Sequence, residues 1–266
     1  MARFLQFAGA LSLMLAPVGA LASLPVDPLT SPMWERLGGA LFGNDVVRFD
    51  DRVKVTFPSI AENQRSFPVS VDARGIAKVK RIIVFADLNP IPLAIDYTPQ
   101  AAQPYLATRI KLDQRTPVRG AVQLEDGSWL VSGGWIDAAG GGCSAPPLSR
   151  VKGDWAEHLG EVRGVALHGR EGTRVRLAFR HPMDTGFVAN IPTYNLEEVT
   201  LTGSGGQPVG TMRIEASVAE DPTITVIANA RAGEKIVLRG SDTNGIRYDG
   251  SILVHETPAS AALAIR

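Results

Sequence analysis

Residues 82–86 read IIVFA, a continuous apolar run of the kind that forms a strand buried on both of its faces. On both sides of this run, apolar residues alternate with polar ones: Val53, Val55 and Phe57; Phe67, Val69 and Val71; Leu106, Thr108, Ile110 and Leu112. Asp126-Gly127 separates two further apolar stretches and indicates a hairpin. Short strands with regular turns predict a β-sandwich of about 100 residues.

The second part of the chain repeats this pattern. Strands are expected near residues 174–180, 196–201, 212–218, 224–230, 235–239 and 251–254, with tight turns at 203–206 and at Asn244-Gly245. A short helix opens at Pro32 and ends at Gly43-Asn44-Asp45. The predicted fold is therefore all-β, with two sandwiches in tandem, an N-terminal helix and a Gly/Pro-rich linker between the sandwiches.

The first residues have the pattern of an export signal. Arg3 precedes a mostly apolar run from Phe4 to Val18, followed by the small-residue site Ala20-Leu21-Ala22, which predicts cleavage before Ser23. An uncleaved anchor is the alternative, but the run is short for a membrane span and contains Pro17. We expect a signal peptide over 1–22, a first sandwich over 23–137, a linker over 138–170 and a second sandwich over 171–266. The signal peptide predicts that the mature protein is located in the periplasm.

Composition excludes several function classes. The 27 basic and 27 acidic side chains balance, and so no broad basic surface for nucleic acid or an anionic membrane is expected. The histidines lack metal-ligand spacing and no C-x-x-C occurs, so neither a metal site nor a cofactor is expected. A single cysteine cannot form a disulfide within its own chain.

That cysteine, Cys143, is the main candidate site. It follows Gly140, Gly141 and Gly142 in the stretch DAAGGGCSAPP, residues 137–147. A lone cysteine is most often a buried, inert core residue, whereas an exposed thiolate is a nucleophile. Three glycines offer no side chains to enclose the thiol and give the backbone many conformations. We therefore expect Cys143 to lie exposed on a flexible arm, to react rapidly with thiol reagents and to form a reducible dimer in oxidised preparations.

Several longer stretches resemble a known pair of proteins. Residues 34–73, 79–99, 107–112 and the GGGC of 140–143 are similar to SoxY, the sulfur-carrier subunit of the periplasmic thiosulfate-oxidising system. FRHPMDTG at 179–186, with 195–202 and 230–245, is similar to SoxZ, its partner subunit. The order Y then Z resembles the fused SoxYZ-like carriers found beside quinoprotein dehydrogenases.

This resemblance implies two immunoglobulin-like sandwiches and a cysteine that holds sulfur intermediates covalently while separate enzymes process them. It implies periplasmic redox enzymes, such as a quinoprotein dehydrogenase or a cytochrome, as partners. In SoxY the cysteine lies near the C-terminus in a GGCGG-like ending. Here Ser144 and Ala145 replace the trailing glycines and the chain continues, so the arm becomes a loop tethered at both ends.

The HPMDTG loop is the second candidate site. A histidine before proline, such as His181, is more often a turn residue hydrogen-bonded to backbone than a catalyst, and Asp184 is suited to capping the same turn. The resemblance implies that His181, Met183 and Asp184 contact the other half or a partner protein.

Three functions remain open at this stage. The first is a covalent sulfur carrier that is not itself an enzyme, and the second is a binding module for a quinoprotein dehydrogenase with a vestigial cysteine. The third is a self-contained thiol enzyme, for which no base is evident.

Overall fold

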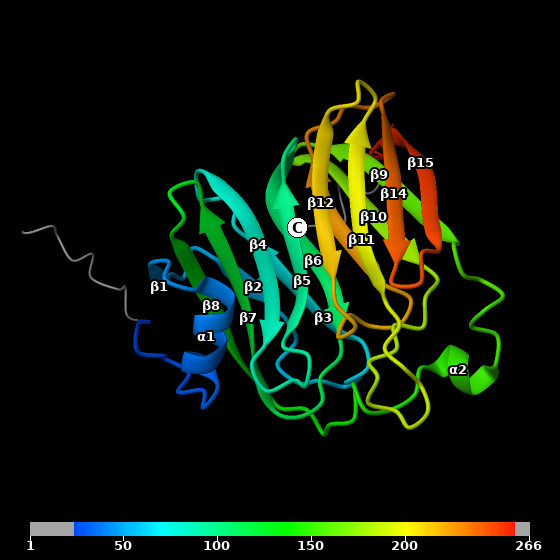
Figure 1. The fold of residues 1–266 in the computed structure, drawn as a ribbon. Helices are drawn as coiled ribbons and strands as arrows, with labels where there is room; N and C mark the ends of the chain where they lie inside the picture. The colour runs from blue at the N-terminus through cyan, green and yellow to red at the C-terminus, as the bar shows by residue number, and fades with distance from the viewer. Residues whose placement is uncertain (1–23, 259–266) are drawn as a thin grey trace, which may run out of the picture.

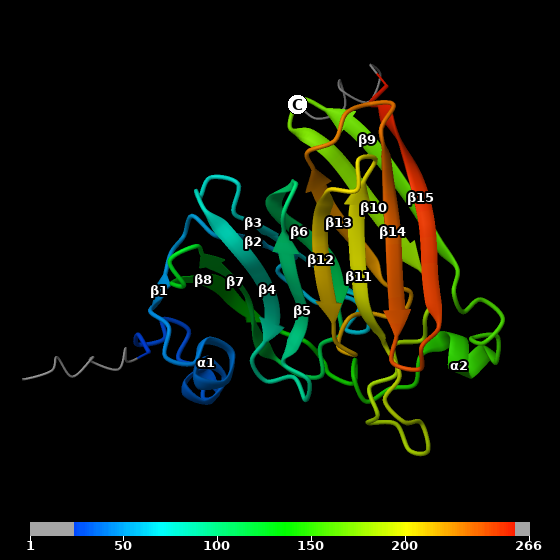
Figure 2. The ribbon, with the colours of Figure 1, turned by 45° about the horizontal axis from the view of Figure 1, so that its top comes forward.

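Two β-sheet layers enclose one core that runs through both halves of the chain. The computed structural model describes residues 24–258, and Figures 1 and 2 show its elements in two views. In the first half these are α1 (Trp34–Phe42), β1 (Val47–Phe49), β2 (Lys54–Thr56), β3 (Phe67–Asp72), β4 (Val79–Ala86), β5 (Leu93–Pro99), β6 (Ala102–Ile110), β7 (Thr116–Leu124) and β8 (Trp129–Ile136). In the second half they are α2 (Leu148–Lys152), β9 (Val162–Gly169), β10 (Gly172–Phe179), β11 (Leu196–Gly203), β12 (Pro208–Ile214), β13 (Thr223–Ala228), β14 (Lys235–Asp242) and β15 (Arg247–Glu256).

The strand order crosses from one half to the other twice. One layer runs β1-β8-β7-β4-β5-β12-β11-β14-β15 and the other β9-β10-β13-β6-β3-β2. β15 joins the layers, because it pairs with β14 along most of its length and with β9 at its end. The pairs β5–β12 and β6–β13 are antiparallel and each joins a first-half strand to a second-half strand. We call these two pairs the seam.

The predicted all-β architecture with an N-terminal helix is confirmed, but the halves are joined more closely than a linker alone would join them. Neither β5 nor β6 is left as an open edge, and an open edge would expose a row of unpaired backbone groups. Ile95 and Tyr97 of β5 share one buried cluster with Met212 and Ile214 of β12. The two sandwiches therefore form one continuous double layer.

Most of the periodic strands lie where the sequence predicts them, but the strand expected near residues 212–218 lies at residues 208–214, as β12, and β5 and β9 are not predicted. The run at residues 82–86 ends β4, and the Asp126-Gly127 hairpin joins β7 to β8 with Gly127 at φ +86°. The expected linker over 138–170 is too long, because residues 162–169 form β9. Gly164 interrupts the apolar pattern of β9. In β5, Ile95 and Tyr97 alternate with polar residues, but prolines at 90, 92 and 99 obscure the strand.

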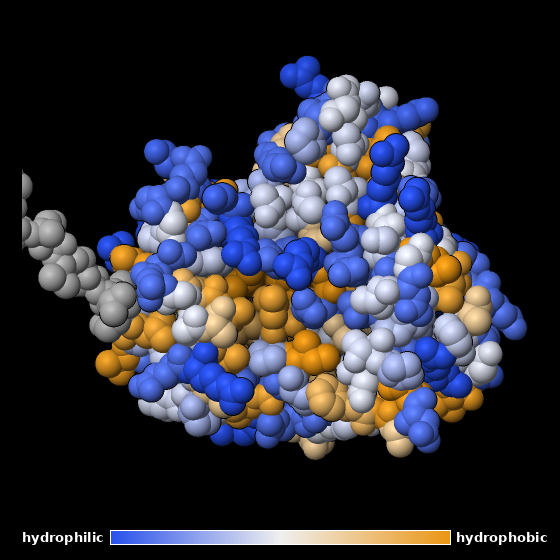
Figure 3. Space-filling view, in the orientation of Figure 1, coloured by the Kyte–Doolittle hydropathy of each residue, from blue (hydrophilic) through white to orange (hydrophobic). Residues whose placement is uncertain are grey.

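The N-terminal helix covers the outer face of the first layer. Trp34 and Phe42 of α1 pack with Phe85 and Trp129 in a second apolar cluster. Figure 3 shows apolar surface gathered over β4 and β5 beside this helix. The lead-in before α1 is held by an ion cluster in which Arg119 of β7 contacts Asp27 at 2.7 Å and Asp87 at 3.0 Å, all three side chains being almost fully buried.

The predicted signal peptide and its cleavage site lie outside the described residues. Within residues 24–258, no helix is both long and apolar enough to cross a membrane.

Candidate functional site

The thiol segment, which we define as residues 137–147, leaves the end of β8 and lies against the chain that follows β6. The amide of Gly142 donates to the carbonyl of Leu112 at 3.1 Å, and the amide of Gly141 donates to the carbonyl of Asp113 at 3.3 Å. Ala145 closes a turn through its amide onto the carbonyl of Gly141 at 3.1 Å. The segment is therefore fixed by backbone hydrogen bonds on the side that faces the first half.

One carboxylate fixes the residues around the thiol. Oδ1 of Asp113 accepts hydrogen bonds from the amide of Cys143 at 3.0 Å, the amide of Ser144 at 3.1 Å and the hydroxyl of Ser144 at 3.0 Å. From the second half, the hydroxyl of Thr185 donates to the carbonyl of Cys143 at 2.5 Å. Cys143 is thereby bound to both halves of the molecule at once.

The three glycines allow close packing in this structure rather than forming a free arm. A Cβ added to Gly142 would lie 2.3 Å from the carbonyl oxygen of Gln64 and 2.4 Å from that of Leu112. Gly140 and Gly141 have φ angles of +101° and +83°, the left-handed region that favours glycine. The expectation of an arm extending freely into solvent is therefore wrong for this conformation, because the segment folds back against its own sandwich.

The expected exposure of Cys143 is also wrong. The residue is 1% exposed, whereas Ser144 beside it is exposed. The enclosing groups come from positions far away in sequence, which a reading of the neighbouring glycines could not reveal. Burial raises the pKa of the thiol to about 12; the positive charge of Lys111 opposes this rise, and the nearby Asp113 adds to it. In this conformation the thiol is protonated and weakly nucleophilic at neutral pH.

Lys111 is the residue of this site that sequence reasoning missed. It is 4% exposed, and its Nζ donates to the carbonyls of Met183 at 2.5 Å and Ala216 at 2.7 Å, both in the second half. Burial lowers the pKa of its ammonium to about 8, although the acidic groups of Cys143, Asp184 and Glu220 act in the opposite direction. The sequence carries no signal for it: Ile110 and Leu112 continue the alternation, which predicts that Lys111 faces solvent, whereas all three residues are buried.

The HPMDTG loop lies directly across the seam from the thiol segment. Nδ1 of His181 accepts a hydrogen bond from the amide of Met183 at 2.9 Å, and the backbone of Met183 is left-handed at φ +54°. Nε2 of His181 lies 3.6 Å from Asp242. Burial lowers the pKa of His181 to about 4; Asp242 opposes this and Lys111 and Arg150 add to it. This arrangement is the turn role expected for His181.

Asp184 connects the same loop to the short helix that follows the thiol segment. Its carboxylate accepts from the guanidinium of Arg150 in α2 at 2.5 Å, and that guanidinium stacks over Trp155 at 3.5 Å from the ring centroid. The amide and carbonyl of Asp184 both pair with Tyr194. The structure therefore brings Cys143 and Gly140, Gly141 and Gly142 together with Met183 and Asp184 at one end of the seam. His181 lies in the same loop as Met183 and Asp184.

No group of three or more His, Cys, Asp or Glu side chains suited to a metal ion occurs among residues 24–258.

Comparison with protein families assigns both halves. The family described as sulfur oxidation protein SoxY matches residues 39–143, and the family described as sulphur oxidation protein SoxZ matches residues 165–252. The chain carries SoxY and SoxZ domains in tandem. The SoxY match ends at Cys143 itself, and the two matches meet along the seam. SoxY and SoxZ domains are those of a sulfur-oxidation carrier, which works with Sox enzymes and is not itself catalytic.

Three solved structures are similar to parts of this chain. The sulfur carrier protein SoxY from Chlorobium limicola f thiosulfatophilum is 20% identical, with a TM-score of 0.36 over 40% of this chain and 91% of that one. The fibronectin(III)-like modules of Clostridium thermocellum CbhA are 13% identical, with a TM-score of 0.24 over 76% of this chain and 95% of theirs. A β-glycosidase from Bacteroides vulgatus is 12% identical, with a TM-score of 0.24 over 76% of this chain and 24% of that one. A search of curated proteins found no match.

Proposed function

We propose that Cys143 of this chain covalently carries a sulfur-containing group in the periplasm and presents it to separate redox enzymes. The observation that carries this proposal is the position of Cys143, the only cysteine of the chain, at the last residue of the SoxY match. The predicted signal peptide supports export, and the predicted partners are a quinoprotein dehydrogenase or a cytochrome. Gly140, Gly141 and Gly142 would supply the hinge for presentation.

Presentation requires the thiol segment to leave the seam. The bonds that hold Cys143 itself are few: its amide to Asp113 and its carbonyl to Thr185. Release also breaks the hydrogen bonds of Gly141, Gly142 and Ser144 to the first half. Each such bond contributes about 1 kcal/mol net, so the partner that binds the released segment has to supply the free energy of opening. The next residue in the chain, Ser144, is already exposed.

Opening also changes the chemistry of the thiol. In solvent the desolvation that raises its pKa disappears, so the thiolate becomes accessible near neutral pH. If the cargo is a thiosulfate-type anion, loading joins its terminal sulfur to Sγ in a new S–S bond. This step releases one proton and two electrons, and the electrons pass to the partner redox enzyme. The closed state keeps the unloaded thiol from side reactions, and the open state makes it reactive.

Intact-mass measurement of the protein purified from its own cells tests the proposal. During sulfur oxidation we expect a reducible mass increase that maps to Cys143 and is missing from Cys143→Ser. Unmodified thiol alone, under conditions in which the partner enzymes turn over, would refute the carrier role.

The burial of Cys143 favours a second candidate, an accessory binding module for a quinoprotein dehydrogenase in which the thiol has no chemical role. The two functions differ in one measurement. A Cys143→Ser chain that supports full activity of the partner enzyme would favour the binding module, and loss of that activity in a folded variant would favour the carrier.

A further inference from the structure

A groove of about 630 Å³ runs across the outer face of the second layer. Its lining comes from both halves: Tyr105 and Arg109 of β6, Arg174 and Arg176 of β10, and Thr225 of β13 are among the residues that form it. The groove therefore exists only because β6 and β13 pair at the seam. We call it the arginine groove.

The charge of the arginine groove has one sign. Arg109, Arg174 and Arg176 are exposed, and the lining contains no aspartate or glutamate. Among residues 24–258, none of these three guanidiniums forms an ion pair. Arg174 stacks on the ring of Tyr105 at 5.4 Å from its centroid, which orients it without neutralising it.

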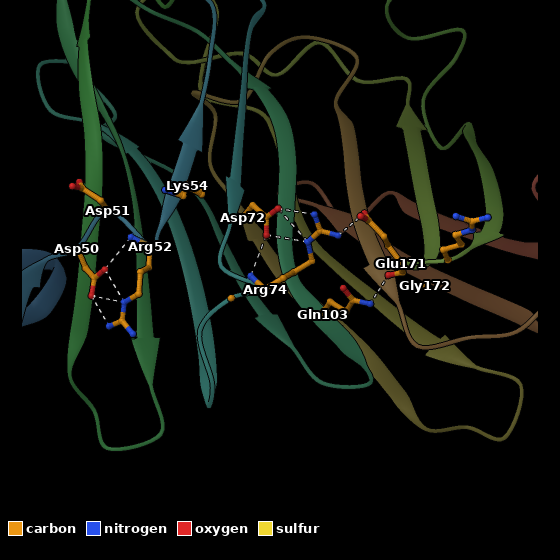
Figure 4. Close-up of a pocket in the computed structure, with 11 residues that line it drawn as sticks. Asp50, Asp51, Arg52, Lys54, Asp72, Arg74, Gln103, Glu171 and Gly172 are labelled. Carbon is orange, nitrogen blue, oxygen red and sulfur yellow. Dashed lines mark hydrogen bonds and ion pairs between the residues drawn. The ribbon is translucent and has the colours of Figure 1, made fainter. Parts of the chain in front are cut away.

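A second groove on the molecule shows the opposite arrangement. Four acidic and four basic side chains line it, as Figure 4 shows for those that it labels. Arg52 pairs with Asp50 at 2.6 Å, and Arg74 pairs with Asp72 at 2.7 Å and with Glu171 at 2.8 Å. Because most of these charges pair with one another and the four of each sign balance, that groove has little to offer a charged ligand. The arginine groove differs in that its guanidiniums retain free donors for an external carboxylate.

We propose that the arginine groove is the docking surface for an acidic face of the protein partner that loads or unloads Cys143. This inference rests on the proposed carrier function and adds the chemistry and position of the partner. Guanidiniums bind carboxylates in a bidentate fashion, and complementary charge accelerates and orients association between proteins.

Other anionic partners fit the groove less well. Three cations on a chain with a formal net charge of zero are few for nucleic acid, which binds broad basic surfaces. A membrane site typically needs about four to eight clustered cations, and the threonines and the concave shape of this groove do not suit a lipid surface. An acidic protein segment fits both the size of the groove and its charge.

The arginine groove also leads to the thiol segment. A guanidinium nitrogen of Arg109 donates to the carbonyl of Ser66 at 3.2 Å, and the neighbouring Arg65 donates to the carbonyl of Pro146 at 3.2 Å. Gln64, in the same loop, packs its carbonyl against Gly142. A partner seated on the groove thus borders the loop at 63–66, which contacts the thiol segment at two places.

A binding experiment on the full chain tests the docking surface with a poly-glutamate peptide as probe. We expect the peptide to bind, its affinity to fall as salt rises, and Arg174→Glu/Arg176→Glu to weaken binding by about tenfold or more. Arg231→Glu/Arg247→Glu is the matched control, because both residues are exposed, form no ion pair among the described residues and change the net charge equally. An equal loss of affinity for the peptide in the two variants, or no binding of the peptide to the unaltered chain, would overturn the proposal. Should the charge reversal impair folding, Arg174→Gln/Arg176→Gln replaces it.

Two further measurements separate the alternatives. Stronger binding of duplex DNA or of phosphatidylglycerol vesicles than of the peptide would assign the groove to another partner and overturn the proposal. In cells, the fraction of loaded Cys143 should fall several-fold in the groove variant and stay unchanged in the control; an unchanged fraction in the groove variant would also overturn it. A wild-type chain that is never loaded contradicts the carrier function, and the peptide experiment then still decides on the docking surface.

Discussion

At Lys111 the cost of burying a charge is offset by contacts that only the second half supplies. Its ammonium donates to the carbonyls of Met183 and Ala216, so the lysine joins the two halves by hydrogen bonds at the end of the seam. We expect Lys111→Met to lower the free energy of unfolding by about 2 kcal/mol, because two buried carbonyls lose their donor. Denaturant unfolding measures the loss. The exposed Lys235→Met is the control. A Lys111→Met chain as stable as this control would show that the hydrogen bonds of Lys111 do not contribute to the free energy of unfolding.

His181 makes the stability of the molecule depend on pH. Burial lowers its pKa from 6.5 to about 4, against the attraction of Asp242. The unfolded chain therefore takes up a proton below pH 6.5, whereas the folded chain does not until about pH 4. The free energy of unfolding should accordingly fall as the pH drops through this window. His181→Asn, which keeps a side-chain acceptor, should flatten that slope, and the exposed His255→Asn should leave it unchanged. Identical slopes in all three proteins would contradict this assignment.

Among the elements, the thiol segment is the one whose behaviour decides the function. Because Cys143 is buried and its pKa is raised to about 12, labelling of the native protein by a thiol reagent should be slow and limited by opening of the segment. Asp113→Ala removes the acceptor shared by Cys143 and Ser144. It should make opening easier by about 1.4 kcal/mol and labelling about tenfold faster.

The exposed Asp249→Ala is the control for this labelling experiment, because it removes the same charge far along the chain on β15. Fast labelling of the unaltered protein would mean that the closed segment is not its main state in solution. Equal rates in Asp113→Ala and the control would remove Asp113 as the anchor of the segment.

The same segment shows how far the sequence determines this site. The period-2 pattern located most strands, and GGGC marked Cys143, since both signals are local. The closed position of the segment depends instead on contacts with Gln64, Leu112 and Thr185, which lie between 31 and 79 residues from Cys143 along the chain. Glycine is equally compatible with a mobile arm and with close backbone packing, so only the tertiary contacts distinguish the two.

At the scale of the whole molecule, the seam makes the two halves depend on each other. Separated, each half would expose two strand edges, β5 and β6 in the first and β12 and β13 in the second. A chain cut after the exposed Gly153 should therefore yield two fragments that co-purify in equal amounts and unfold in one transition. Analytical ultracentrifugation and denaturant unfolding of the co-expressed fragments measure both properties.

A substitution at Gly210 can weaken the β5–β12 pair of the seam in this fragment experiment. A Cβ at this position would lie 2.6 Å from the ring of Tyr97, across the β5–β12 pair, whereas a Cβ at Gly75 would meet nothing within 4 Å. Gly210→Ala should weaken association of the fragments, because the ring must shift within a packed core, and Gly75→Ala should not. Fragments that fold separately without associating would show that the continuous sheets are not needed for stability. Fragments that associate equally well with either substitution would place the binding energy outside this part of the seam.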